Sequence, residues 1–370
     1  MSGPGLYVHI PFCTKKCPYC DFFSVPFDER TVYAYADAVI RNARHYKEHY
    51  DTVYFGGGTP GAAWRDVCRI LGKLMFTEGA EITVEANPVS LTKDSLMSLK
   101  NSGVNRLSVG VQSFSNAELR VLGRVHTSEE ASHSIKLAVE SGFRNISADL
   151  MLGIPNQTPD SVRRSIKVLA ALNIQHVSAY MLKIEPNTPF AKMSLKLPDE
   201  NLTAQIYLSA AAALEESGFM QYEISNFAKE GFECKHNLKY WRSEEYLGIG
   251  TSAHSFYDGE RFFVISDIGE FIKDNVQKII VTEKKDSDKA SFDDYAMLKL
   301  RLTEGLTFAE CERFGVKKEA MMRRCKLVPP DYLKISNKSV AITREGFLVS
   351  NQIIRKLTTE PMVQVTNGSE

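Results

Sequence analysis

The stretch YVHIPFCTKKCPYC, residues 7–20, begins as a β-rich run and ends in three closely spaced cysteines. Cys13, Cys17 and Cys20 have the spacing C-x3-C-x2-C and come directly after the first predicted strand. Three thiolates on one loop can converge on a single polynuclear iron site. A [4Fe–4S] cluster held by three cysteines keeps one iron without a protein ligand, so the number three itself indicates an open coordination position.

Two other interpretations of the cysteines remain open on spacing alone. A structural zinc site normally has four protein ligands from Cys and His. His9, upstream on the predicted strand, would have to be the fourth ligand, because no fourth cysteine lies nearby. The second alternative is a chance group of buried thiols. The other four cysteines are scattered, and we expect ordinary buried thiols at Cys68, Cys234, Cys311 and Cys325.

Composition excludes several classes of protein. The 370 residues carry 45 basic and 45 acidic side chains, so no overall field favours nucleic acid or an anionic membrane. No run of about 20 apolar residues could span a bilayer. The first residues lack the basic and apolar regions of a secretory signal. Seven cysteines in a chain of this length favour a reducing, cytoplasmic compartment with metal or redox chemistry.

The first two thirds of the chain alternate between strand and helix patterns. Strand-like runs occur at 6–12, 51–58, 81–88, 106–113, 146–155 and 176–186. Helical spacing of apolar residues follows at 31–49, 62–76, 92–101, 116–140 (with a break near Gly123), 159–172 and 200–216. Six strands alternating with six helices predict a parallel sheet with helices outside. The pattern leaves open an incomplete barrel or a doubly wound sheet.

The pattern changes after Gly218. We predict an α/β core over 1–220, an extension of strands and loops over 221–285, and a small helix-rich, winged-helix-like domain over 286–370. The charged stretch 283–290 is a plausible linker before that domain. The last domain has no basic recognition stripe, so a DNA-reading role is disfavoured.

A glycine run closes the second predicted strand. In YFGGGTP, residues 54–60, three glycines allow the backbone to approach a ligand closely and to present its own amides and carbonyls. A tight strand-to-helix turn is the simpler interpretation of the run taken alone.

Together these motifs resemble the radical S-adenosylmethionine proteins. YVHIPFC, YFGGGTP, RLSVGVQSF, LGRVHT, DLMLGIP and HNLKYW are similar to the oxygen-independent coproporphyrinogen III oxidase-like family, and within it to the HemW-type heme chaperones. The resemblance covers nearly the whole chain. It implies a partial (β/α)6 barrel with a [4Fe–4S] cluster at its open, carboxyl-terminal face. The open iron would chelate S-adenosylmethionine, and reduction would cleave the sulfonium to methionine and a 5′-deoxyadenosyl radical.

The resemblance also implies a set of residues around S-adenosylmethionine. Tyr7 would lie beside the sulfonium and Tyr19 over the cluster loop, while Glu85 would accept from ribose hydroxyls. The full set implied for the cofactor is Tyr7, Tyr19, Gly57, Gly58, Thr59, Glu85, Gln112, Arg124 and Asp149. Simpler roles remain open for several: Tyr7 as core, Gln112 as a partner of backbone amides, and an Arg124–Asp149 ion pair. Glu85 and Asp149 lie in otherwise apolar strands, where a carboxylate is costly to bury without a partner.

Heme binding is implied by the same resemblance. The motif HNLKYW, residues 236–241, groups His236, Tyr240 and Trp241, and imidazole is a common axial ligand of heme iron. His254 is the rival ligand and His126 a weaker one. A packed, hydrogen-bonded histidine is the alternative for His236.

The residue at position 22 bears on function. The oxidising branch of the family has a fourth cysteine two residues after the third, and Phe22 stands there in this chain. We therefore expect a heme chaperone that passes heme to an apoprotein, one of the respiratory chain. A membrane-bound acceptor would be met peripherally. The alternative is an oxidase that converts coproporphyrinogen III to protoporphyrinogen IX; a radical enzyme for another substrate is a third interpretation.

Overall fold

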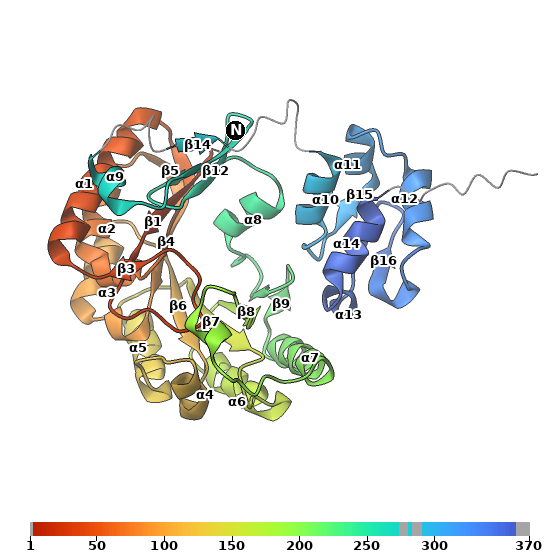
Figure 1. Ribbon diagram of the computed structural model, residues 1–370, viewed down its shortest axis with the longest axis horizontal. Coiled ribbons are helices and arrows are strands. Elements are labelled where there is room, and N and C mark those ends of the chain that lie inside the picture. Colours follow the sequence, from red (N-terminus) through yellow and green to blue (C-terminus); the bar gives the residue numbers. More distant parts are fainter. Residues whose placement is uncertain (1–2, 274–279, 283–290, 360–370) are drawn as a thin grey trace, which may run out of the picture. The chain divides into compact units, whose positions relative to one another are not determined.

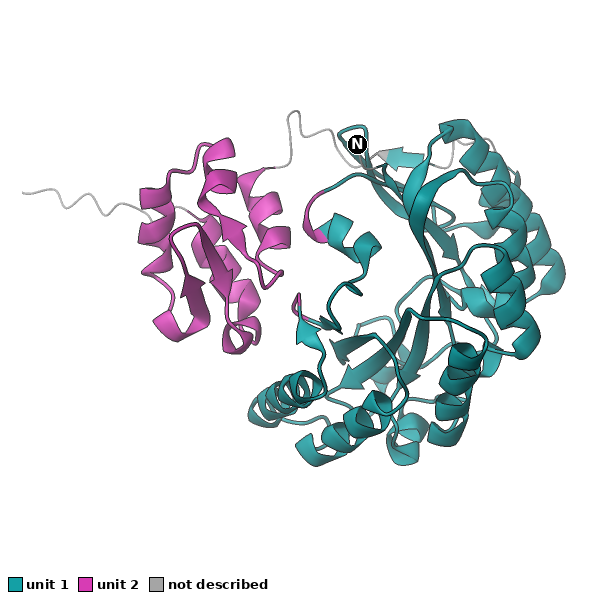
Figure 2. Ribbon diagram, turned by 180° about the vertical axis from the view of Figure 1, so that it is seen from behind, with its two compact units in different colours: residues 1–221, 225–240, 244–285 teal, residues 222–224, 241–243, 286–370 magenta. Residues whose placement is uncertain are grey.

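The computed structural model describes residues 3–273, 280–282 and 291–359. These residues form two compact units, shown in different colours in Figure 2. Unit 1 comprises 1–221, 225–240 and 244–285, and unit 2 comprises 222–224, 241–243 and 286–370. Most of the extension expected over 221–285 therefore packs within unit 1. The predicted linker at 283–290 lies outside the described residues.

Unit 1 is built on one large sheet with helices around it (Figure 1). Its strands are β1 (Gly5–Ile10), β2 (Phe12–Cys13), β3 (Val25–Pro26), β4 (Tyr50–Gly57), β5 (Phe76–Ala86), β6 (Arg106–Gln112), β7 (Ile146–Leu152), β8 (His176–Met181), β9 (Met220–Gln221), β10 (Asn226–Ala228), β11 (Tyr246–Ile249), β12 (His254–Tyr257), β13 (Glu260–Val264) and β14 (Ile280–Thr282). Its helices are α1 (Glu29–Tyr46), α2 (Trp64–Leu71), α3 (Lys93–Asn101), α4 (Asn116–Val121), α5 (Ser128–Glu140), α6 (Pro159–Ala170), α7 (Glu200–Glu216), α8 (Lys235–Trp241) and α9 (Ile268–Lys273), with short 3-10 turns at Pro60–Ala63, Pro88–Ser90 and Pro189–Lys192.

The order of the strands decides between the two predicted architectures. β1, β4, β5, β6, β7 and β8 lie side by side in chain order, and every neighbouring pair is parallel. A doubly wound sheet would reverse its order at a switch point. The consecutive order is that of a barrel, so the prediction of a partial (β/α)6 barrel is confirmed. β11 adds a seventh parallel strand beside β1, and antiparallel strands continue the sheet at both edges.

The predicted helices are present, and their ends follow local capping chemistry. Thr92 and Thr158 each begin a helix in a capping box with the serine three residues later. The predicted segment 116–140 is broken as expected into α4 and α5 around Gly123. One segment was mispredicted: the motif 236–241, expected as strand and loop, lies within helix α8.

Helix α8 lies on the concave face of the sheet, against the amino-terminal halves of β4 and β5. Its first amides, those of Lys235 and His236, donate to the Glu81 carboxylate at 3.3 and 3.2 Å. Further along α8, the buried Lys239 ammonium contacts Asp51 at 3.0 Å. A carboxylate at its start therefore holds this short helix in place.

Unit 2 is a small helical domain with a three-stranded sheet. Its helices are α10 (Phe292–Lys299), α11 (Phe308–Arg313), α12 (Lys318–Cys325), α13 (Arg344–Phe347) and α14 (Ser350–Thr358), with a 3-10 turn at Pro330–Tyr332. The sheet has the order β15 (Leu306–Thr307), β17 (Ser339–Ile342), β16 (Leu333–Ile335), and both pairs are antiparallel.

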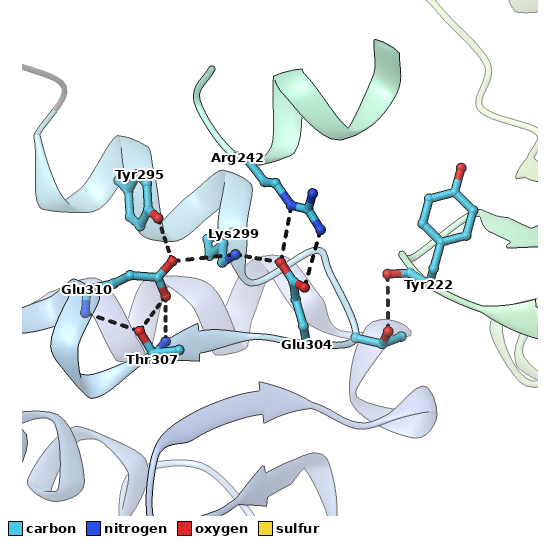
Figure 3. Close-up of polar contacts among 8 residues, drawn as sticks. Tyr222, Arg242, Tyr295, Lys299, Glu304, Thr307 and Glu310 are labelled. Carbon is cyan, nitrogen blue, oxygen red and sulfur yellow. Dashed lines mark hydrogen bonds and ion pairs between the residues drawn. The ribbon is translucent and has the colours of Figure 1, made fainter. Parts of the chain in front are cut away.

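A polar network connects α10, α11 and the segment 241–243 in unit 2 (Figure 3). The nearly buried Lys299 ammonium contacts Glu304 at 2.6 Å and Glu310 at 3.5 Å. Arg242 reaches the Glu304 carboxylate at 3.4 Å, which ties the segment 241–243 into this unit. Glu310 also accepts from the Tyr295 hydroxyl at 2.7 Å and forms a capping box with Thr307. One carboxylate thus serves a buried cation, a phenol and a helix start.

Replacing Glu310 by alanine should therefore destabilise unit 2. The change removes the Glu310 half of the capping box, while the Thr307 hydroxyl still caps α11, and it leaves the Tyr295 hydroxyl without its acceptor. Together these losses should lower the opening free energy by about 2 kcal/mol. Hydrogen exchange of peptides from unit 2 measures this as faster exchange. Glu312→Ala, on the exposed side of the same helix, is the matched control and should have little effect. Equal exchange in both variants would contradict this role of Glu310.

Candidate cofactor site at the carboxyl ends of the strands

The cysteine loop is closed at its base by backbone pairing. β2 and β3 are parallel, with Phe12 opposite Val25 and Cys13 opposite Pro26. The Phe27 amide donates to the Cys13 carbonyl at 3.0 Å. Cys13 lies on β2 itself, and Cys17 and Cys20 lie between β2 and β3; residues 12–26 together are called the cysteine loop. Its base is therefore fixed by the fold, independently of any bound group.

His9 holds the carboxyl-terminal part of this loop in place. Its Nε2 donates to the Phe23 carbonyl at 3.0 Å, and its Nδ1 accepts from the Tyr7 hydroxyl at 3.0 Å. Burial lowers the pKa of His9, so the ring stays neutral. Because both ring nitrogens are engaged within the protein, His9 is not placed to be the fourth ligand of a zinc ion.

The three clustered thiols are free and partly exposed. Burial raises the pKa of Cys20, and its neighbours Cys17 and Cys13 add to that rise. Within the described ranges, no three His, Cys, Asp or Glu side chains are close enough to hold a single metal ion. With His9 engaged elsewhere, three clustered thiols fit a polynuclear iron cluster better than a structural zinc ion, which normally takes four protein ligands.

The glycine run of β4 lies directly against the cysteine loop. A Cβ on Gly58 would come within 2.7 Å of the Phe12 backbone, and one on Gly57 within 2.5 Å of the His9 ring. Gly57 also has a φ of 109°, which favours glycine. The amides of Gly57, Gly58 and Thr59 already donate to Glu85, Ile10 and Phe12. Any contact of this run with a ligand ammonium would therefore come from acceptor oxygens.

Two carboxylates face the interior of the barrel below the loop. Glu85 accepts from the Tyr54 hydroxyl at 2.8 Å, and burial together with repulsion from Asp149 raises its pKa to about 7. Asp149 accepts from the Ser108 hydroxyl at 3.2 Å, and burial raises its pKa to about 6. Both groups would gain from a ligand that donates hydrogen bonds, as ribose hydroxyls do.

Arg124 lies in the turn between α4 and α5 and reaches the cysteine loop. Its Nη1 lies 3.4 Å from the Cys17 sulfur and 3.5 Å from the Tyr19 hydroxyl. Its Nη2 donates to Asn87 and to the Gly110 carbonyl, both at 2.6 Å. The alternative Arg124–Asp149 ion pair is not formed among the described residues.

Tyr7 and Tyr19 take different positions. Tyr7 stacks on Tyr54 with ring centroids 6.2 Å apart. Tyr19 packs beside Phe190 at 6.0 Å, and the Phe190 amide donates to the Pro18 carbonyl at 3.0 Å. The loop after β8 therefore supports the cysteine loop from one side.

Gln112 ends β6 with an unusual backbone. Its φ of 68° is uncommon for a residue with a side chain, and the register to β7 shifts beside it. Among the described residues its side-chain amide has no hydrogen-bond partner, so the expected pairing with backbone amides is not seen.

One residue of the site escaped prediction. Asn87, directly after β5, donates to the Thr59 hydroxyl at 3.1 Å and accepts from Arg124. Its signal in the sequence is a polar residue between a buried strand and Pro88. That signal also fits a simple turn, so sequence alone did not separate Asn87 from other loop residues.

The motif 236–241 lies behind this site: the His236 ring stacks on Tyr54 with centroids 5.3 Å apart, and Tyr54 stacks on Tyr7 and donates to Glu85. His236 is fully buried; its ring nitrogens lie 2.8 Å from the Thr52 and Tyr240 hydroxyls. Because both ring nitrogens are engaged by hydroxyls, ligation of heme iron by His236 would require one of these hydrogen bonds to be released, and it stays a prediction. Trp241 belongs to unit 2, where the Arg301 guanidinium lies 5.6 Å from its ring centroid.

The other candidate histidines differ in exposure. His254 is exposed on β12, and its ring stacks on Phe263 at 5.2 Å. His126 is buried, donates from Nε2 to the Val111 carbonyl at 3.0 Å, and has a pKa lowered to about 4 by burial and by Arg124.

The raised pKa of Glu85 predicts how stability depends on pH. The folded protein holds a proton on this carboxyl up to about pH 7, whereas the unfolded chain releases it near 4.5, so the free energy of unfolding falls as pH rises between these values. Glu85→Gln should abolish this loss, worth about 1–3 kcal/mol between pH 5.5 and 8. Urea titrations of the reduced, unloaded protein measure it.

The difference between the wild type and Glu85→Gln removes the contribution of the histidines to the pH dependence, because both proteins carry the same histidines. Glu140→Gln, at an exposed position of α5, should keep the wild-type dependence on pH. If the free energy of unfolding of the Glu85→Gln variant fell with pH as steeply as that of the wild type, the burial of this carboxyl would be contradicted.

Comparison with known proteins agrees with this geometry. A model of the Radical SAM superfamily matches residues 7–169. The heme chaperone HemW of Haemophilus influenzae is 33% identical over 380 residues, which cover 96% of this chain and 98% of the relative. HemW of Escherichia coli is 40% identical over 269 residues, 69% of this chain and 71% of the relative.

A solved structure shares the fold. The coproporphyrinogen III oxidase HemN of Escherichia coli, a radical SAM enzyme, superposes with a TM-score of 0.79 over 97% of this chain and 91% of its own, at 24% identity. At that identity the likeness shows the fold alone. The likeness to the HemW relatives, by contrast, runs along almost the whole of both chains. The chain therefore belongs to the HemW family of radical SAM proteins.

Proposed function

We propose that this protein binds heme and delivers it to an apoprotein, and that it carries a [4Fe–4S] cluster and S-adenosylmethionine. The observation that carries the proposal is the match to a heme chaperone over 98% of that relative's length. All seven cysteines are free, which suits a reducing, cytoplasmic setting. Within the described residues no helix is both long and apolar enough to cross a membrane.

The cluster would be held by Cys13, Cys17 and Cys20. Once reduced, a cluster of this kind supplies the electron that cleaves the sulfonium of S-adenosylmethionine. The residues proposed around that cofactor are Tyr7, Tyr19, Gly57, Gly58, Thr59, Glu85, Gln112, Arg124 and Asp149. Among them, Glu85 and Asp149 would accept from hydroxyl groups, and Arg124 would supply positive charge beside the cysteine loop. The aromatic face of Tyr7 suits a cation.

Phe22 supports delivery over oxidation. Its side chain is 69% exposed at the position where the oxidising branch has a cysteine. A thiol is therefore missing on the solvent side of the loop, while the three clustered thiols are kept. The second candidate function is oxidation of coproporphyrinogen III, the reaction named for HemN; the fold that the two proteins share is compatible with both functions.

Two parallel incubations separate the two functions. We expect anaerobically loaded protein to bind heme and pass it to an apo-cytochrome, followed by the Soret absorption of the acceptor. With coproporphyrinogen III and a reductant we expect no protoporphyrinogen IX above the level of a Cys13→Ala control. Product well above that control would overturn an exclusively delivering role.

The heme ligand is tested separately. We propose His254 as the axial ligand, because its ring is exposed to an incoming heme whereas His9, His126, His176 and His236 are buried. His254→Ala should change the absorption spectrum of bound heme and weaken binding about tenfold or more. His133→Ala, an exposed histidine on α5, is the matched control.

His236→Ala should instead lower stability, because it empties a buried site and leaves the Thr52 and Tyr240 hydroxyls without their partner. An unchanged spectrum in His254→Ala, together with a changed one in a folded His236→Ala protein, would restore the motif 236–241 as the heme site.

A further inference from the structure

A continuous chain of hydrogen bonds connects two of the three clustered thiols. The Cys17 sulfur lies 3.4 Å from Nη1 of Arg124, whose Nη2 donates to Oδ1 of Asn87 at 2.6 Å. Nδ2 of Asn87 donates to the Thr59 hydroxyl at 3.1 Å, and that hydroxyl lies 3.7 Å from the Cys13 sulfur. Thr59, Asn87 and Arg124, which we call the donor relay, come from three separate segments of unit 1.

The direction of every bond in the donor relay is fixed by chemistry. A guanidinium has only donors, so the Asn87 atom that faces Arg124 must be its carbonyl oxygen. The amide nitrogen of Asn87 must then face Thr59 and donate to it. A thiolate that ligates a cluster carries no proton and can only accept, so the single proton of the Thr59 hydroxyl is directed to the Cys13 sulfur. Both ends of the relay consequently donate to sulfur.

The donor relay is held rigidly. Nη2 of Arg124 is also bonded to the Gly110 carbonyl at 2.6 Å, and the Arg124 amide donates to the Leu119 carbonyl at 3.0 Å. A Cβ on Gly110 would lie only 3.2–3.4 Å from Gln112, Asn87 and Arg124, so a glycine leaves room for the group. Thr59 is buried as well. These donors are therefore in place before any cofactor binds.

We propose that the donor relay raises the reduction potential of the cluster held by Cys13, Cys17 and Cys20. Hydrogen bonds to the sulfurs are one of the factors that set the potential of an iron–sulfur cluster. Accepting one electron makes the cluster more negative, and both the donors and the Arg124 charge stabilise that state. Bonds in series also polarise one another, so Arg124 acts on Cys13 as well, through Asn87 and Thr59.

The inference rests on the proposed cofactor, and the test keeps the two apart. Iron and sulfide content of the reconstituted protein shows whether a cluster binds at all. The midpoint potential is then measured without S-adenosylmethionine, by dithionite titration followed by electron paramagnetic resonance. A wild-type protein without iron would overturn the cofactor, whereas a loaded protein with unshifted variants would overturn only the donor relay.

Thr59 offers a matched pair of variants. Thr59→Val keeps the shape and removes the donor to Cys13; it should lower the equilibrium constant for reduction at least threefold, or roughly 30 mV. Thr59→Ser keeps the hydroxyl and should retain the wild-type potential. Equal potentials in the valine, serine and wild-type proteins at equal iron content would contradict the inference.

Asn87→Asp tests the relay itself. Aspartate has nearly the same shape, but it adds a negative charge and would accept the Thr59 proton instead of leaving it to Cys13. We expect a larger fall in potential than in Thr59→Val. Adding Thr59→Val to Asn87→Asp should lower the potential by less than it does in the wild type, because the donation to Cys13 is already lost.

Arg124→Gln, with Arg120→Gln as its control, separates the effect of the contact with Cys17 from that of losing one positive charge. Arg120 is exposed on α4, so both variants lose one positive charge but only Arg124→Gln loses the contact with Cys17. The potential should fall only in Arg124→Gln.

Additive shifts of the reduction potential in the Thr59→Val and Asn87→Asp variants would overturn the relay. So would variants that lose iron without a change of potential in the remaining cluster, because these residues would then serve assembly alone.

Discussion

The contact between the glycine run of β4 and the cysteine loop is the constraint on which the site depends. Gly58 packs so closely on the Phe12 backbone that no side chain fits, and its amide pairs with the Ile10 carbonyl. This contact places the cysteine loop over the carboxyl end of the neighbouring strand. Consecutive parallel strands then bring Glu85, Gln112 and Asp149 to the same end of the barrel. A larger residue at Gly58 would move the loop away from all of them.

At the opposite end of the barrel, the polar side chains are arranged differently. There the polar groups satisfy one another: Glu81 caps α8, Lys239 pairs with Asp51, and His236 joins two hydroxyls. At the carboxyl end, by contrast, burial raises the pKa values of Glu85 and Asp149 although both accept hydrogen bonds, and Gln112 has a strained backbone. Buried carboxylates with raised pKa values beside a strained backbone, at one end of parallel strands, indicate a place for a ligand.

Sequence predicted those features that depend on near neighbours in the chain. The apolar spacing of the helices and the cysteine spacing are both local, and the structure bears out the first. Helix α8 was missed because its cap is Glu81, more than 150 residues away. The contact of His236 with Thr52 was missed for the same reason, because Thr52 lies 184 positions upstream. Asn87 could not be predicted as a site residue, because its role depends on contacts with Arg124 and Thr59, which lie in other segments of the chain.

Phe22 shows how one scaffold can serve two functions. The loop uses the backbone at this position: the Phe22 carbonyl accepts from Lys16 at 3.0 Å, and its backbone bonds to the Cys20 thiol. The side chain itself points into solvent and contributes nothing to the frame of the loop. Exchange of cysteine and phenylalanine there would leave the three clustered thiols and their donors unchanged. The difference between oxidation and delivery can therefore lie in what this exposed position offers to a porphyrin, while the cluster site beneath it stays the same.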